Sequence, residues 1–349
     1  IIIYKEDFIM HIPDNYLSPS TCTTLFVAMT PIWYYSIRKI NKITADKIPL
    51  IGIGGAFAFI LMMLTAIPDG TTAHAVGGTL IALLLGPYAA CIAISVALFI
   101  QAIIFGDGGI LSFGANCFNI AFILPFTGFF IYKILNKIHL SPFYHKCTIF
   151  LSAYISINLA AFFTALELGI QPLLFVDNLG QPLYCPYPLW ISIPAMALSH
   201  LTIAGIAEGL FTLSLYLFIL KTSPNIIYDS QQIKLNSIFS LLAFLIIISP
   251  LAQAEGTAWG EWAPEEIVND TSSGVPLGFI PEKLLNGFNY EAFFPDYTMN
   301  GTTDILAYIA SAIIGVALLI IIFKILGSII YAKKQSFDNS AKIPKWLLT

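Results

Sequence analysis

The stretch IPLIGIGGAFAFILMMLTAI, residues 48–67, contains no charged side chain. A run of about 20 mostly apolar residues crosses the hydrocarbon core of a bilayer as a helix. Similar windows recur along the whole chain, at 20–37, 71–88, 88–105, 115–135, 148–168, 191–220, 235–253 and 304–326. The sequence therefore predicts an all-α polytopic membrane protein with about nine transmembrane helices.

The composition supports this fold class. The chain has 349 residues, of which 57% are hydrophobic and 10% are charged, with a mean hydropathy of +0.82. Soluble domains carry about 25% charged residues, so this chain cannot cover a water-facing surface. The five cysteines form no C-x-x-C pair, which argues against a zinc or iron–sulfur site and a disulfide framework. We find no P-loop, no H-E-x-x-H or G-x-S-x-G motif and no nucleic-acid module, and expect no nucleic-acid partner.

The distribution of charge predicts the orientation in the membrane. If the N-terminus lies outside, all 16 basic residues except Lys5 and Lys283 fall on the cytoplasmic side of the nine predicted spans. The predominantly acidic segment 254–303 then forms a large external loop between the last two spans. We expect a seven-helix core at 10–221, a cytoplasmic linker at 222–234 and a C-terminal two-helix module at 235–349.

Two histidines are the candidate metal ligands. If the working chain begins at Met10, its second residue is His11, and a free amine, the next backbone nitrogen and the imidazole can chelate one metal. His74, predicted about one turn inside the third span, can add a nitrogen. Such donors suit Ni(II), Cu(II) or Co(II). Taken alone, His74 is better explained as a buried histidine bonded to a backbone carbonyl, but its predicted place on the same side as Met10 and His11 favours a metal ligand. We interpret residues 1–9, which carry three charges, as a spurious N-terminal extension.

Two further polar clusters lie in or beside predicted spans. The glycine-rich stretch 105–109 is either a tight external turn or the floor of a pocket, where Asp107 or Asn116 would support the metal ligands. His200 and Glu208 lie on the seventh predicted span, where an ionisable residue needs a partner. They either pack within the bundle, or contact a transporter partner or line the exit path of the metal.

Several stretches together resemble the CbiM/NikM family, the substrate-capturing membrane components of cobalt and nickel energy-coupling-factor transporters. They are residues 10–14, Thr71–Gly78, Leu85–Pro87, Phe105–Asn116 and His200–Gly209, which follow one another in the expected order. The stretches Glu255–Trp262 and Phe294–Tyr297 resemble the C-terminal extension of longer members, which is similar in plan to the small auxiliary subunit CbiN or its nickel counterpart.

The resemblance implies a function and partners. It implies that the Met10 amine, the backbone nitrogen and ring of His11 and the ring of His74 bind one transported Co(II) or Ni(II). It also implies a multi-pass protein of a prokaryotic cytoplasmic membrane, supplying cobalt for cobalamin synthesis or nickel for nickel enzymes. The partners would be a CbiQ-like coupling subunit, CbiO-like ATP-binding subunits and a small auxiliary membrane subunit.

The sequence leaves two alternative functions open and does not decide between cobalt and nickel. A membrane-embedded metal-dependent enzyme would need an open coordination position and a general base near the metal. A ligand-free assembly subunit would leave the Met-His pair and His74 unexplained. We expect a transporter component without its own ATPase, without a cofactor and without a catalytic residue. The residues do not indicate whether cobalt or nickel is preferred.

Overall fold

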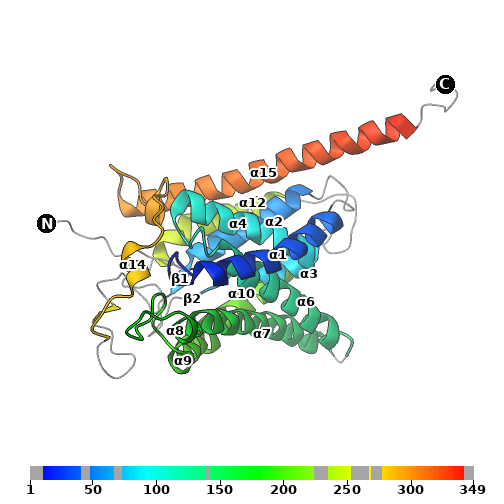
Figure 1. The fold of residues 1–349 in the computed structure, drawn as a ribbon. Helices are drawn as coiled ribbons and strands as arrows, with labels where there is room; N and C mark the ends of the chain where they lie inside the picture. Colours follow the sequence, from blue (N-terminus) through cyan, green and yellow to red (C-terminus); the bar gives the residue numbers. More distant parts are fainter. Residues whose placement is uncertain are drawn as a thin grey trace.

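The computed structural model describes residues 11–40, 48–66, 73–138, 141–223, 235–252, 267–268 and 277–341. Met10, most of the linker predicted at 222–234 and much of the loop predicted at 254–303 lie outside these residues. The described helices run side by side in one bundle, with α15 along one edge and α7 near the opposite edge (Figure 1). The described chain is almost entirely helical, which confirms the predicted all-α polytopic class.

Helices α1 to α10 form the N-terminal part of the bundle. Their bounds are α1 Pro19–Ile40, α2 Ile48–Met63, α3 Gly78–Leu85, α4 Pro87–Ile100, α5 Phe113–Asn116, α6 Leu124–Leu135, α7 Pro142–Gly169, α8 Gln171–Leu174, α9 Leu189–Ser199 and α10 Gly205–Thr222. Three π-helical segments interrupt or extend them, namely η2 Gln101–Phe105, η3 Cys117–Ile123 and η4 His200–Ala204. π-Helical segments inside α-helices often occur at functional sites.

The C-terminal part adds two long apolar elements and a covering segment. Its helices are α12 Asn236–Ile248, η5 Ser249–Ala252, α14 Glu282–Asn286, η6 Pro295–Tyr297 and α15 Asp304–Ala341. Among the described residues, the helical stretches 87–105, 113–135, 142–174, 189–222 and 304–330 are long and apolar enough to cross a membrane. All five overlap windows predicted from the sequence.

The segment predicted as the third span has a different structure. Strand β1 (Thr65–Ala66) pairs antiparallel with β2 (Ala73–His74), and α3 follows from Gly78. The eight residues of α3 are about 12 Å long, far short of a hydrocarbon core about 30 Å thick. Gly86, at φ 88°, ends α3, and Pro87 begins α4. The prediction of a complete helical span at 71–88, with His74 inside it, is therefore wrong.

Glycines bring α15 into close contact with α2. A Cβ atom added to Gly52 would lie 2.7 Å from the Cβ of Phe323, and one added to Gly315 would overlap the ring of Phe59. Small residues allow membrane helices to approach closely and gain van der Waals contact. The last helix of the C-terminal module is thus packed directly on the core rather than held only by the chain connection.

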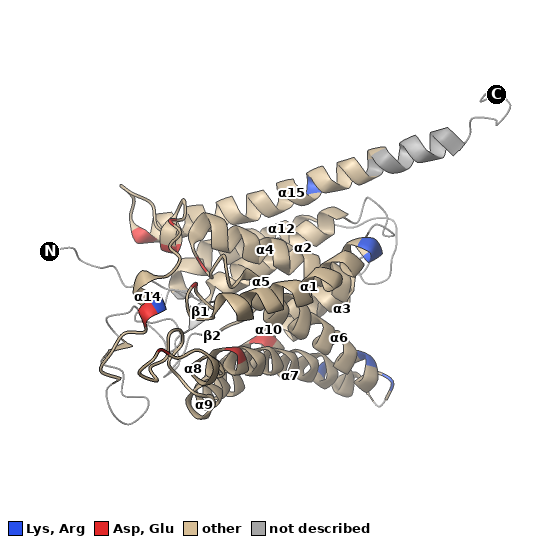
Figure 2. Cartoon of the chain, viewed as in Figure 1, with Lys and Arg blue, Asp and Glu red and all other residues tan. Residues whose placement is uncertain are grey.

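Charge and cysteines follow the predicted pattern in the described residues. Figure 2 shows basic residues toward the end of the bundle where α1 ends and α6 meets α7, and acidic residues of α14 and α15 toward the other end. The basic Lys283 beside Glu282 is an exception at the acidic end. All five cysteines are free, and four of them are buried, as expected for packing residues.

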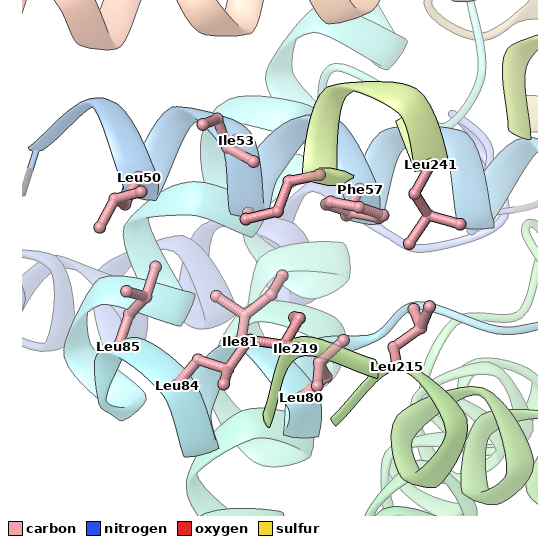
Figure 3. Close-up of a pocket in the computed structure, with 12 residues that line it drawn as sticks. Leu50, Ile53, Phe57, Leu80, Ile81, Leu84, Leu85, Leu215, Ile219 and Leu241 are labelled. Carbon is pink, nitrogen blue, oxygen red and sulfur yellow. The ribbon is translucent and has the colours of Figure 1, made fainter. Parts of the chain in front are cut away.

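An apolar pocket lies between α2, α3, α10 and α12 (Figure 3). Leu50 and Phe57 of α2 face Leu84 of α3, and Ile219 and Leu241 line its sides. Its lining carries no nitrogen or oxygen donor on a side chain. This pocket therefore has no side chain that can bind a metal ion, and the candidate ligands lie elsewhere.

Candidate metal centre

The segment before α1 is held in place by the stretch between η2 and α5. The side-chain amide of Asn116 clamps Ile12: its Oδ1 accepts the Ile12 N–H at 3.0 Å and its Nδ2 donates to the Ile12 carbonyl at 3.1 Å. The N–H of Gly109 donates to the same carbonyl at 3.0 Å. These bonds fix the backbone directly beside His11. Asn116, predicted as a supporting residue, thus forms hydrogen bonds with Ile12, the neighbour of the candidate ligand His11.

The glycine-rich stretch lies against His11. Gly108 has φ 82°, and a Cβ there would lie 2.9 Å from the Cβ of His11. A glycine is needed both for this backbone conformation and for the close approach. Asp14 secures the same stretch, because its carboxylate accepts the N–H groups of Ile110 at 2.9 Å and Leu111 at 2.7 Å. The stretch therefore lies directly against His11, and its role as the floor of a metal pocket stays a prediction.

His11 and His74 come together although the sequence separates them widely. Their ring centroids are 5.2 Å apart with an interplanar angle of 64°. With a metal–nitrogen bond of about 2 Å, two imidazoles on one ion place their centroids roughly 4.5 to 6.5 Å apart. His11 is 4% exposed, and its Nε2 is buried without a hydrogen-bond partner among the described residues. The pair has the spacing needed to share one ion.

Asp107 is the hydrogen-bond partner of the other His11 nitrogen. Its Oδ1 accepts the Nδ1–H of His11 at 2.7 Å, and its Oδ2 accepts from Nε2 of Gln101 at 3.1 Å and from the hydroxyl of Tyr297. Burial raises the pKa of Asp107, but His11 and the Tyr297 hydroxyl lower it by more, and the pKa lies below its usual value. Asp107 is therefore a carboxylate near neutral pH and fixes the tautomer of His11.

The ring of His11 is not oriented for the predicted chelate. A small chelate ring that includes the backbone nitrogen and the imidazole of the same histidine closes through Nδ1, which here faces Asp107. In the observed orientation the nitrogen available to a metal is Nε2. A half-turn about the Cβ–Cγ bond, which is a soft two-fold torsion in histidine, would free Nδ1 and bring Nε2 to the side lined by Asp107. The chelate therefore requires this half-turn.

The two imidazoles do not complete a coordination sphere. Within the described ranges, no group of three or more His, Cys, Asp or Glu side chains is arranged to hold a metal ion. Met10, whose amine is the predicted additional donor, lies outside the described residues.

His200 and Glu208 surround the His74 segment rather than His11. Glu208, fully buried on α10, accepts the N–H groups of Val76 and Gly77 at 2.8 Å each, just before α3 begins. Its carboxyl group lies at the positive end of the α3 dipole. Nδ1–H of His200 donates to the Met196 carbonyl at 2.9 Å, and η4, which carries His200, packs on β2. Both residues support the backbone that positions His74.

Three buried polar residues of the structure were not among the site residues predicted from the sequence. Gln101 and Tyr297 contact Asp107 and also each other, with 3.0 Å between Nε2 and the hydroxyl. Glu167, buried in α7, accepts from Nδ2 of Asn119 in η3 at 2.8 Å. Gln101 and Glu167 could have been identified by the criterion applied to Glu208, a polar group inside an apolar window. For Tyr297, the only signal in the sequence was its place in the Phe294–Tyr297 stretch, which resembles the C-terminal extension of longer family members.

Two families of known proteins match this chain. The family described as "Cobalt uptake substrate-specific transmembrane region", CbiM, matches residues 11–226, and the PDGLE domain matches residues 234–332. The first match covers the residues that form the candidate centre except Tyr297, and the second covers Tyr297 and α12 together with most of α15.

Full-length relatives carry the same two parts. The chain is 43% identical over 321 residues to the "Probable fused nickel transport protein LarMN" of Lactiplantibacillus plantarum, covering 90% of this chain and 97% of that protein. It is 40% identical over 330 residues to the "Fused nickel transport protein NikMN" of Rhodobacter capsulatus, covering 89% and 95%. A crystal structure of a transition metal transporter is 48% identical, with a TM-score of 0.59, and covers 63% of this chain and 96% of that one.

Proposed function

The chain belongs to the CbiM family of cobalt uptake substrate-specific transmembrane regions and carries a PDGLE domain, and on that premise we propose that it captures Ni(II) or Co(II) outside the cell. It would deliver the ion across the cytoplasmic membrane of a prokaryote as the substrate-specific component of an ATP-driven energy-coupling-factor transporter. Its relatives are named as transport proteins, so the chain is a transporter component rather than an enzyme.

One observation carries this proposal: the unpartnered Nε2 of His11 is buried beside the ring of His74, 5.2 Å between centroids. An imidazole nitrogen buried without a partner loses hydrogen bonds to water, and a metal ion would restore the lost stabilisation. Imidazole and main-chain nitrogen donors suit Ni(II) and Co(II), whereas Mg²⁺ and Ca²⁺ prefer oxygen. The site therefore fits a transition-metal cargo.

We propose Ni(II) rather than Co(II) as the preferred transported ion. Two relatives that match across both parts of the chain, at 43% and 40% identity, are named as nickel transport proteins. Relatives named as cobalt transport proteins match a smaller share, for example 31% identity over 52% of this chain for the CbiM of Roseiflexus. Competition between the two ions for the purified protein measures this preference directly.

Energy must come from other subunits. The sequence has no P-loop, so the chain has no recognisable ATP site of its own. We propose a CbiQ-like coupling subunit and CbiO-like ATP-binding subunits as partners, with the C-terminal module in the place of a separate auxiliary subunit. The relatives named as fused proteins support that last assignment.

Uptake depends on these partners if the proposal is correct. In cells without their own nickel and cobalt uptake, the chain co-expressed with the coupling and ATP-binding subunits is expected to accumulate Ni(II), measured by elemental analysis of washed cells. An ATP-binding subunit that cannot hydrolyse ATP should abolish accumulation, while the purified chain still binds metal. Accumulation independent of ATP hydrolysis, or a purified chain that binds neither metal, would contradict the proposal.

The metal site should face the outside. The end of α1, whose last turn carries Arg38, lies toward the basic end of the bundle, and β2, which carries His74, lies toward the other end (Figure 2). With basic residues on the cytoplasmic side, single cysteines at Asp177 and Asp270 should react with an impermeant maleimide in intact cells, and one at Lys42 only after permeabilisation. Labelling of all three before permeabilisation, or the reverse pattern, would contradict this orientation. The half-buried Cys147 is replaced in the background protein.

A further inference from the structure

Tyr297 connects the C-terminal module to the candidate metal centre. It lies in η6, just before α15, yet its hydroxyl donates to the Oδ2 of Asp107, whose Oδ1 accepts from His11. Tyr297 is 3% exposed, so its hydroxyl cannot exchange this partner for bulk water. A three-residue chain of hydrogen bonds therefore runs from the PDGLE part of the chain to the ligand His11.

The ring of Tyr297 is fixed from several sides. It stacks on Phe105 with 4.9 Å between ring centroids and an interplanar angle of 24°, and it packs edge-on with Tyr308 at 5.4 Å between centroids. Tyr297 and the preceding Asp296 have φ values of 60° and 52°, an uncommon conformation for residues with side chains. Such conformations persist only where the surrounding structure imposes them, and they occur often at functional sites.

The part of the segment 288–297 that precedes Tyr297 is also bound to the core. The N–H of Phe294 donates to the carbonyl of Ile104 at 2.8 Å, and the hydroxyl of Tyr290 donates to the carbonyl of Ile103 at 3.1 Å. The side-chain amide of Asn15 exchanges two hydrogen bonds of 2.8 Å with the backbone of Phe288. These contacts bring the segment across the end of η2, beside the loop that carries Asp107.

We propose that Tyr297 is a positioning residue for metal capture, by which the C-terminal module holds the Asp107 carboxylate in place for the imidazole of His11. Metal-binding histidines commonly donate their second ring N–H to a carboxylate, and loss of such support costs about 10- to 100-fold in metal affinity. Asp107 has two other partners, His11 and Gln101, so loss of the hydroxyl should loosen it without leaving it unpaired. The inference rests on the proposed function.

The experiment compares two tyrosines of the same module. Tyr297→Phe removes the hydroxyl that contacts Asp107, and Tyr308→Phe removes a buried hydroxyl that donates to the Met63 carbonyl and has no hydrogen bond to Asp107. The full chain, purified in detergent, is titrated with Co(II) against a chromophoric chelator, and the Co(II) absorption bands are recorded. We expect Tyr297→Phe to weaken binding about 10-fold and shift the bands. Tyr308→Phe should keep the wild-type affinity and bands.

A double-mutant cycle separates positioning from general stability. If the hydroxyl acts through the carboxylate, Tyr297→Phe should add little to Asp107→Asn, because the two residues form one network. Wild-type affinity in Tyr297→Phe, equal losses in both tyrosine variants, or additive losses in the double variant would overturn the proposal. If one of these results is found while His74→Ala still abolishes metal binding, only the proposed role of Tyr297 is refuted and the proposed function is not. A wild-type chain that binds no Co(II) would overturn both.

Discussion

Replacing His74 with alanine is expected to lower the affinity for Ni(II) or Co(II) by more than about 100-fold. Loss of a residue that merely supports a ligand already costs about 10- to 100-fold, and loss of a ligand costs more. The described chain offers no third His, Cys, Asp or Glu side chain that could replace His74 beside His11. His11→Ala should have a similar effect, since it removes the other imidazole and leaves Asp107 without its histidine partner.

A matched control is available at the other end of the bundle. His145 on α7 has its Nδ1 at 2.9 Å from Oδ1 of Asn136, far from the candidate centre, so His145→Ala should leave metal binding unchanged. Isothermal titration with the purified variants measures affinity, and circular dichroism checks that the helices persist. Near-normal binding by both His74→Ala and His11→Ala would refute the site assignment.

A chain that begins at Met10 is expected to bind the metal at least about 100-fold more tightly than one that retains residues 1–9. Only the shorter chain offers a terminal amine beside His11, and extension converts that amine into a peptide nitrogen, which is a much poorer donor. The loss amounts to removal of a ligand and should be correspondingly large. Metal coordination also favours loss of the proton from the amine near neutral pH.

A removable extension provides the control for this prediction. The same extended chain, cut by a specific protease immediately before Met10, should regain the affinity of the short chain, with mass spectrometry to verify both termini. The outcome also tests the ring orientation, since the chelate requires the Nδ1 of His11 to leave Asp107. Equal affinity before and after cleavage would show that the amine is not a ligand, and would favour binding through Nε2.

Patterns of apolar residues predicted the architecture well but failed at one segment. Long windows such as 148–168 correspond to single helices because nothing in them interrupts the backbone hydrogen bonds. The window 71–88 is also mostly apolar, yet Gly77 has a positive φ and Gly86 and Pro87 break the helix, so that its described residues before α4 are helical only in α3. Hydropathy averages over such breaks.

The sequence could predict those parts of the candidate centre that single residues and short motifs indicate. It could not predict contacts that form only between distant residues of the folded chain. The Met-His sequence and an ionisable residue in an apolar segment both indicate chemistry by themselves, so His11 and His74 were identified. Tyr297 contacts Asp107 across 190 positions of sequence, and a tyrosine in a polar loop has many ordinary explanations. The contacts of Glu208 likewise depend on where α3 begins, which the sequence did not reveal.

The glycine contacts between α15 and α2 have a consequence for assembly. An interface built from Gly52, Gly55 and Gly315 relies on short-range packing and contributes little to recognition at a distance. When two such partners belong to one polypeptide, the second binding event is intramolecular, with an effective concentration of about millimolar for a short connection. A weak helix pair can then stay associated even when the protein is scarce in the membrane. Each copy of the core also receives one copy of Tyr297, whatever the rate of synthesis.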